Sequence, residues 1–152
     1  MKPFYHFIAS AVLGILFYFL SRNALAGLIV FLAGVFIDLD HLIDFWALKP
    51  KNPFSLKEFL DEKTYQTKRK WFFIFLHNWE LIAVLWLICY FSDWQVYLLA
   101  LTLGFTTHLL LDIYNLASKK MSPFSYFLIY RIVKGFQTNT CHSGEPREAS
   151  PE

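Results

Sequence analysis

Three histidines of the chain each have a carboxylate three or four residues away, within or beside apolar runs. The pairs are Asp38 with His41, His77 with Glu80, and His108 with Asp112. Residues at these spacings share one face of a helix, so each pair would present an imidazole and a carboxylate together. Imidazole and carboxylate are the ligands of zinc, manganese and non-haem iron sites. The pattern predicts a divalent metal centre built from several helices.

The acidic residues stand where charge is costly. The stretch GLIVFLAGVFIDLDHLIDFW, residues 27–46, begins as an apolar run and then contains Asp38, Asp40, His41 and Asp44. Ionisable side chains inside a membrane usually mark a functional site. An ion of charge +2 would compensate clustered carboxylates that otherwise repel one another.

The candidate ligands outnumber those that one tetrahedral ion uses. We expect one or two divalent ions, zinc or manganese before iron, held by Asp38, His41, His77, His108 and Asp112. The surplus predicts either a two-metal centre or carboxylates that orient the imidazoles from outside. Glu80 or Asp40 would act as the general base. A simpler alternative stays open, in which such residues join helices by hydrogen bonds, with Asp40 paired to a basic residue and Glu80 in a salt bridge.

Four apolar segments must position these residues. They cover about 4–20, 24–46, 71–91 and 95–117. Their lengths suit a hydrocarbon layer about 30 Å thick. The chain is 56% hydrophobic and 20% aromatic, which exceeds what a soluble domain of 152 residues needs for its core. The sequence predicts an all-α integral membrane bundle of about four transmembrane helices plus a short C-terminal interfacial helix.

The basic residues predict an orientation. The loop 47–70 holds seven lysines and arginines, whereas the short connections 21–23 and 92–94 hold one and none. The positive-inside rule then places this loop and both termini in the cytoplasm. In that orientation, the predicted ligands all lie in the cytoplasmic third of the membrane.

The C-terminal part contains two further segments. The run 123–136 combines aromatic residues with Arg131 and Lys134, which predicts a short helix in the interface. Together with the four spans it completes a transmembrane domain at 1–136, and 137–152 is a polar tail expected to be disordered. One alternative concerns the first span, because Lys2, the apolar run and Ala24-Leu25-Ala26 also fit a cleaved signal peptide.

The order of these motifs resembles a known family. An early histidine (His6), Gly34-Val35-Phe36-Ile37-Asp38-Leu39-Asp40-His41, a mid-chain histidine (His77), and a second motif from Gly104 through His108 to Asp112 are similar to the YdjM-like predicted membrane-bound metal-dependent hydrolases. The resemblance covers about residues 6–115. It implies a hydrolase with a few transmembrane helices, and metal-site positions at His6, Asp38, His41, His77, His108 and Asp112. Many members carry a second histidine shortly after the middle one, where this chain has His77-Asn78-Trp79-Glu80, and Glu80 would replace it.

We therefore expect a hydrolase of a lipid or lipid-linked (phospho)ester at the cytoplasmic face, with a metal-activated water as the nucleophile. Arg131 and Lys134 could attract an anionic headgroup. The alternative is a divalent-cation or proton transporter that uses the same cluster, although the outer halves of the spans are apolar. A di-iron oxidoreductase ranks lower because the repeated Glu-x-x-His pattern is absent. The expected partners are membrane lipids, the net charge of +2 does not favour nucleic acid, and the sequence does not indicate an oligomeric state.

Overall fold

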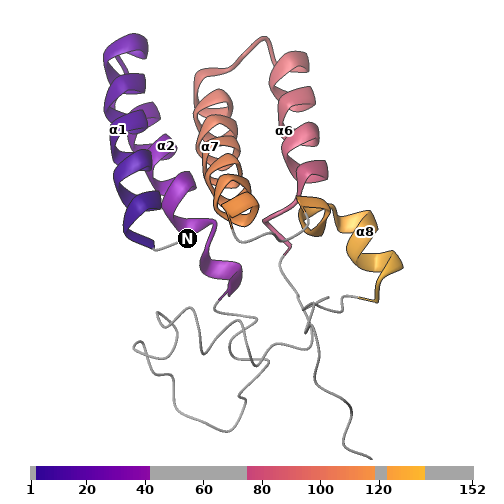
Figure 1. Cartoon of the computed structure of the whole chain (residues 1–152). Coiled ribbons are helices and arrows are strands. Elements are labelled where there is room, and N and C mark those ends of the chain that lie inside the picture. Colours follow the sequence, from indigo (N-terminus) through magenta and orange to yellow (C-terminus); the bar gives the residue numbers. More distant parts are fainter. Residues whose placement is uncertain (1–2, 42–74, 119–122, 136–152) are drawn as a thin grey trace, which may run out of the picture.

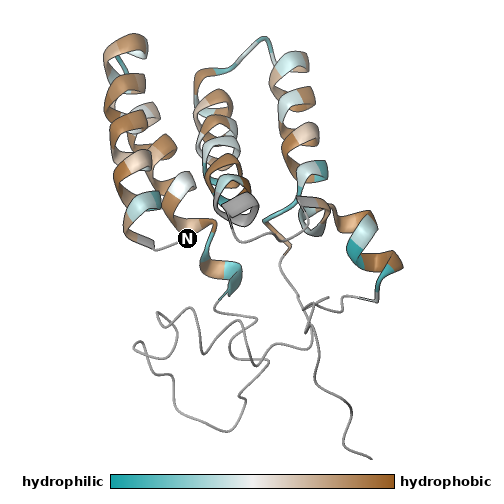
Figure 2. Ribbon diagram, viewed as in Figure 1, coloured by the Kyte–Doolittle hydropathy of each residue, from teal (hydrophilic) through white to brown (hydrophobic). Residues whose placement is uncertain are grey.

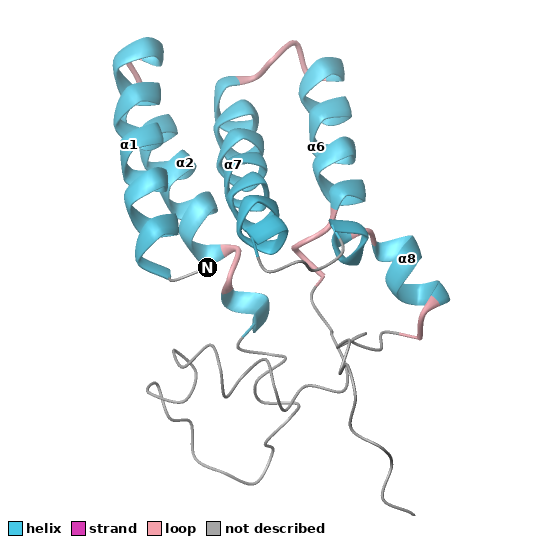
Figure 3. Cartoon of the chain, in the orientation of Figure 1, coloured by secondary structure: helices cyan, strands magenta, loops and turns pink. Residues whose placement is uncertain are grey.

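The computed structural model describes residues 3–41, 75–118 and 123–135, and for 115–118 it describes the backbone alone. These residues form helices and connecting turns without strands (Figure 3). The long helices are α1 (Pro3–Ser21), α2 (Ala24–Phe36), α6 (Trp79–Phe91) and α7 (Val96–Ser118). A short 3-10 helix, η1 (Pro123–Tyr126), and the short helix α8 (Leu128–Val133) follow. The predicted all-α membrane bundle is confirmed.

Three apolar stretches are long enough to cross a membrane, which indicates that the protein is integrated in one. They are Phe4–Ser21, Ala24–His41 and Val96–Tyr114. The helix α6 is apolar but has 13 residues, and the predicted span 71–91 begins before the described residues. The predicted loop 47–70, the tail 137–152 and Asp44 also lie outside the described residues.

The helices expose large apolar side chains and bury small or polar ones. Phe4, Leu20 and Phe91 are each 65% or more exposed, whereas Ala26, Ala100 and Thr102 are fully buried. Figure 2 shows the hydrophobic colour spread over the helices and the hydrophilic colour gathered at turns and helix ends. This distribution suits helices that are surrounded by lipid.

The helix α1 packs along α2, α2 packs along α7, and α6 contacts α7 on its other side (Figure 1). Glycines allow the close approach of α2 and α7. A Cβ atom at Gly104 would lie 2.7 Å from both the Ala33 Cβ atom and the Val30 carbonyl oxygen. A Cβ atom at Gly34 would collide with the Ser10 hydroxyl group of α1. Small residues of this kind let membrane helices approach closely.

Two of the predicted helices are shorter than the apolar pattern suggests, because α2 ends earlier and α6 begins later. The helix α2 stops at Phe36, and a turn at Ile37 and Asp38 precedes the short helical stretch that contains His41. The prediction of one continuous helix over 24–46 is therefore wrong at Asp38.

The helix α6 begins at Trp79, because the Asn78 side chain caps it by accepting a hydrogen bond from the Leu81 N–H at 2.6 Å. His77 thus lies before the helix, and the prediction that it shares a helical face with Glu80 is also wrong.

Candidate metal centre

Seven polar side chains gather at one end of the bundle. They come from the first turns of α1, the segment after α2, the residues before α6, and the second half of α7. They are His6, Asp38, Asp40, His41, His77, His108 and Asp112. Every ligand predicted from the sequence thus lies in one cluster.

Four ligand atoms face one another at the core of this cluster. The Nε2 atoms of His77 and His108 are 3.1 Å apart. The Asp38 Oδ1 atom lies 3.3 Å from each of these nitrogens. The Asp112 Oδ2 atom lies 3.6 Å from His77 Nε2 and 3.4 Å from His108 Nε2. We call these four residues the central quartet.

These separations fit ligands around a single ion. A tetrahedral zinc site has bonds of about 2.0–2.2 Å, so its ligand atoms lie about 3.3–3.6 Å from one another. The distances of the two imidazole nitrogens from each other and from the two carboxylate oxygens run from 3.1 to 3.6 Å. The donor set of two imidazoles and two carboxylates also matches the chemistry of zinc, manganese and iron.

Hydrogen bonds on the far side of each ring determine which nitrogen faces the centre with a lone pair. The His108 Nδ1 atom is 2.7 Å from the Gly34 carbonyl oxygen, which can only accept, so Nδ1 donates. The His77 Nδ1 atom is 3.1 Å from Asp40 Oδ2, which also accepts from the Leu76 N–H. A neutral imidazole that donates from Nδ1 has its lone pair on Nε2. When both imidazoles are neutral, as metal ligation requires, both Nε2 lone pairs point at the centre, together with two carboxylates.

Lone pairs that face one another repel unless a cation lies between them. Imidazoles bound to a metal almost always donate their other N–H to a carboxylate or a backbone carbonyl. In this structure Asp40 serves His77 in that way, and the Gly34 carbonyl serves His108. The described His and Asp residues could therefore hold a metal ion.

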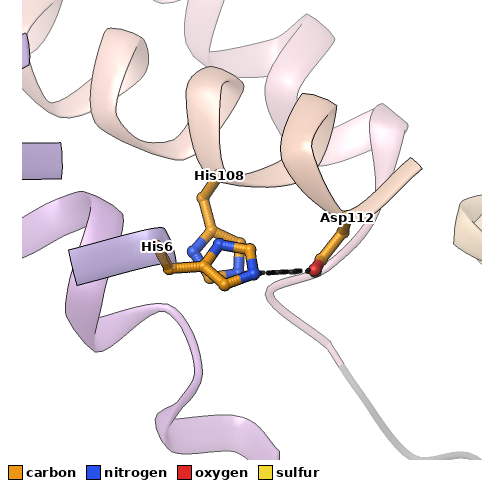
Figure 4. A group of neighbouring side chains, drawn as sticks. All are labelled: His6, His108 and Asp112. Atoms are coloured by element: carbon orange, nitrogen blue, oxygen red, sulfur yellow. Dashed lines mark ion pairs between the residues drawn. The ribbon is translucent and has the colours of Figure 1, made fainter. Parts of the chain in front are cut away.

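His6 lies behind the quartet, on the far oxygen of Asp112. Its Nε2 atom is 3.1 Å from Asp112 Oδ1, and its ring stacks on that of His108 with centroids 4.1 Å apart. Figure 4 shows His6 reaching from α1 towards the two α7 side chains. His6, His108 and Asp112 also form a group of three whose ligand atoms lie within 4.8 Å of one another. In the one-ion arrangement, His6 orients Asp112 so that its other oxygen faces the quartet.

The centre is exposed at the segment that follows α2. The side chains of Asp38 and His41 are 33% and 21% exposed, whereas those of His77 and His108 are fully buried and that of Asp112 is 9% exposed. The His41 Nε2 atom is 3.6 Å from Asp38 Oδ1. Asp38, His41 and His77 form the second group of three that could hold an ion. Among the described residues, this edge is the part of the cluster that is accessible from outside the protein.

The two residues predicted as general bases lie away from this exposed edge. Asp40 is buried against His77, with one oxygen shared between His77 Nδ1 and the Leu76 N–H. Both oxygens of Glu80 accept hydrogen bonds from the backbone of α8, at 3.0 Å from the Leu128 N–H and 3.1 Å from the Ile129 N–H. The structure therefore brings Asp40 to the cluster as an orienting residue, and it does not bring Glu80 into the cluster.

The predicted headgroup residues differ from each other. Arg131 is 3% exposed and donates a hydrogen bond to the His77 backbone carbonyl at 3.1 Å, so it points into the protein and not towards a headgroup. Lys134 is exposed at the end of α8.

Sequence reasoning missed the Gly34 carbonyl, although Gly34 begins the quoted motif, and it missed Tyr126. The buried Tyr126 ring lies with its centroid 6.3 Å from that of His77. Tyr126 is one of several aromatic residues in the predicted interfacial run 123–136, and nothing in the sequence distinguishes it from the others.

Comparison of the chain with protein-family models, with curated proteins and with solved structures finds no match.

Proposed function

We propose that the protein is a membrane-embedded metal-dependent hydrolase that cleaves a lipid or lipid-linked ester, a phosphoester above all. The observation that carries the proposal is the central quartet, in which the Nε2 atoms of His77 and His108 lie 3.1 Å apart and each lies 3.3–3.6 Å from one oxygen of Asp38 and one of Asp112. The order of motifs shared with the YdjM-like family supports hydrolysis as the reaction class. Zinc or manganese fits the donor set, and iron is compatible with it.

The residues divide into holders, orienting groups and one group that faces the substrate. Asp38, His77, His108 and Asp112 would hold the ion, which supplies a water of lowered pKa as the nucleophile. Asp40, the Gly34 carbonyl and His6 fix the orientation of the holders. These contacts keep the site in one geometry before a substrate arrives.

His41 is the residue best placed for proton transfer. It lies at the exposed edge, 3.6 Å from the Asp38 carboxylate, and an imidazole can both accept and donate a proton. It would accept a proton as the water oxygen bonds to the phosphorus or acyl carbon. It would then return that proton to the leaving oxygen as the ester bond breaks. Products are an alcohol and a phosphate or acid.

The substrate class follows from the position of the centre. Asp38, His108 and Asp112 lie in the second halves of apolar segments that could cross a membrane, and His77 directly precedes the apolar helix α6, so a substrate already in the leaflet reaches the quartet most directly. The positive-inside rule places this end at the cytoplasmic face, as part of the proposal.

The first experiment is metal analysis of detergent-purified protein by mass spectrometry. Wild-type protein is compared with His108→Ala and Asp112→Ala, and His142→Ala serves as the control because it removes a histidine outside the predicted set. We expect one ion per chain in the wild type and the control, and loss of the ion in the other two variants. A folded wild-type protein that binds no zinc, manganese or iron after addition of each would refute the proposal.

A second variant separates holding the ion from proton transfer. We expect His41→Ala to retain the ion and to lose about 10²–10⁴-fold in the rate of hydrolysis of a phosphoester lipid in vesicles. If the wild-type chain holds two ions and His41→Ala loses one of them, both groups of three bind metal. Transport of the ion into sealed vesicles without hydrolysis would favour the transporter.

A further inference from the structure

His77 contributes to the central quartet from a stretch that is not helical. Residues 75–77 form bends, and the extended residue Asn78 precedes α6, which begins at Trp79. A ligand on such a stretch lacks the support of a helical backbone, so other contacts must fix it. Within the stretch, the Asn78 side chain donates to the Phe75 carbonyl and caps α6. Asp40 adds support by accepting from the Leu76 N–H and from His77 Nδ1, and a further set of contacts comes from the opposite end of the described chain.

The helix α8 buries its charge and exposes its apolar residues. Arg131 is 3% exposed, whereas Ile129, Ile132 and Val133 are 67%, 58% and 77% exposed. A buried arginine is rare unless it is paired. Here its guanidinium group donates to the His77 backbone carbonyl at 3.1 Å, from 54 residues away in sequence.

The electrostatic environment keeps this guanidinium charged inside the protein. Burial lowers the pKa of Arg131, and the negative charges of Glu80 and Asp40 oppose that decrease. Asp40 is the same carboxylate that accepts from His77 Nδ1. One buried cation is therefore placed near both the backbone of His77 and the carboxylate that orients its ring.

A second connection runs from Glu80 to the start of α8. Phe127 precedes this helix and makes no side-chain cap, so Glu80 accepts from the free N–H groups of Leu128 and Ile129 instead. Glu80 follows His77 by three residues, and Arg131 follows Leu128 by three. The segments 77–80 and 128–131 are thus joined by a hydrogen bond at each end. The Tyr126 ring of η1 lies beside the His77 imidazole.

We propose that η1 and α8 fix the position of the His77 ligand, with Arg131 as the positioning residue. The inference rests on the proposed function, because it concerns assembly of the same metal centre. Residues 123–134 would then belong to the centre without contacting the ion. Changes in this segment would alter metal affinity through the His77 backbone.

The test uses the full chain in detergent and Co²⁺ as a spectroscopic probe. Arg131→Met keeps an unbranched apolar stem, removes the charge and the N–H donors, and suits a buried position. Lys134→Met is the matched control, because it removes an exposed charge from the end of the same helix. Arg131→Lys tests rescue by a cation, and Glu80→Ala releases the other connection.

We expect Arg131→Met and Glu80→Ala to weaken Co²⁺ binding about tenfold or more and to change the visible Co²⁺ spectrum, at unchanged helicity by circular dichroism. Arg131→Lys should recover part of the affinity, and Lys134→Met should match the wild type. Amide hydrogen exchange of residues 75–78 should accelerate in Arg131→Met without metal, which reports the anchoring directly.

Wild-type affinity, spectrum and exchange in Arg131→Met would overturn the inference and leave the proposed function intact. Failure of the wild-type protein to bind any Co²⁺ would overturn the proposed function and with it the ligand role of His77. The two failures differ, because the first shows a metal centre whose Co²⁺ affinity does not depend on Arg131, whereas the second shows no metal centre.

Discussion

The rings of His77 and His108 are oriented by different acceptors, a carboxylate for one and a backbone carbonyl for the other. The Gly34 carbonyl cannot be removed by a side-chain substitution, but Asp40 can. Asp40 Oδ1 is buried and has no hydrogen-bond partner among the described residues. A buried carboxylate with an unused oxygen is costly. The other oxygen of Asp40 contacts the Nδ1 atom of a candidate ligand, His77, and this contact fits an orienting role.

Asp40→Asn should weaken metal binding without abolishing it. The amide can still accept from His77 Nδ1 but no longer carries the charge that strengthens the ligand, so we expect an affinity loss of about 10–100-fold. Asp38→Asn, which alters a member of the central quartet, should lose the ion altogether. Titration of both variants with Zn²⁺, by calorimetry or competition with a chelating dye, measures the difference. Equal losses in the two variants would contradict the division between holder and orienting residue.

At this scale, the sequence was sufficient to place the ligands in one cluster. Imidazole and carboxylate types in apolar runs identified Asp38, His41, His77, His108 and Asp112 as candidate ligands, the family resemblance added His6, and the structure brings all six together. The sequence was not sufficient to predict the contacts of Glu80 and Arg131. Their partners lie 48 and 54 residues away, and nothing local to either residue indicates such a contact.

At the scale of elements, the helices end where the centre begins. Hydrophobic residues continue past Phe36 and precede Trp79, so the pattern predicted longer helices than those that form. The turn at Asp38 and the cap at Asn78 depend on backbone hydrogen bonding that hydrophobicity does not report. The short connections 21–23 and 92–94 were easier to predict, because each is a polar break between two apolar runs.

Gly104→Ala should destabilise both the bundle and the metal centre. Alanine favours a helix over glycine by up to about 1 kcal/mol. The added Cβ atom would, however, meet Ala33 and the Val30 carbonyl at 2.7 Å, and overpacking of this kind costs about 1–3 kcal/mol. His108 lies one turn further along α7, so separation of α2 from α7 also lengthens the hydrogen bond from His108 Nδ1 to the Gly34 carbonyl oxygen. We expect a lower midpoint of thermal unfolding and weaker metal binding.

The control for this variant is Val84→Ala, on the exposed side of α6. It removes two methyl groups from a side chain that is 49% exposed, away from the contact of α2 with α7, so both quantities should stay near the wild-type values. A stability of Gly104→Ala equal to that of the wild type would show that α2 and α7 can separate without cost.

At the scale of the whole molecule, three apolar segments support membrane integration, and the orientation remains a prediction from the basic residues. The two cysteines provide a natural probe, because Cys89 is buried and Cys141 belongs to the polar tail. We expect a membrane-impermeant maleimide to label Cys141 only after the cells are permeabilised. Asp93→Cys in a Cys141→Ser background should be labelled in intact cells, since the turn 92–94 is predicted to face outside. The reverse pattern would invert the topology and move the proposed reaction to the outer face.

The stacking of His6 on His108 has a practical consequence for producing the protein. The helix α1 begins at Pro3, so its first residue is only about 4.5 Å along the helix axis from His6. A polyhistidine sequence joined to Met1 would therefore bring competing imidazoles to the edge of the candidate centre. The metal content of protein with such an N-terminal polyhistidine sequence would include ions bound by the added histidines. A handle at the C-terminal end, or one free of histidine, avoids the artefact.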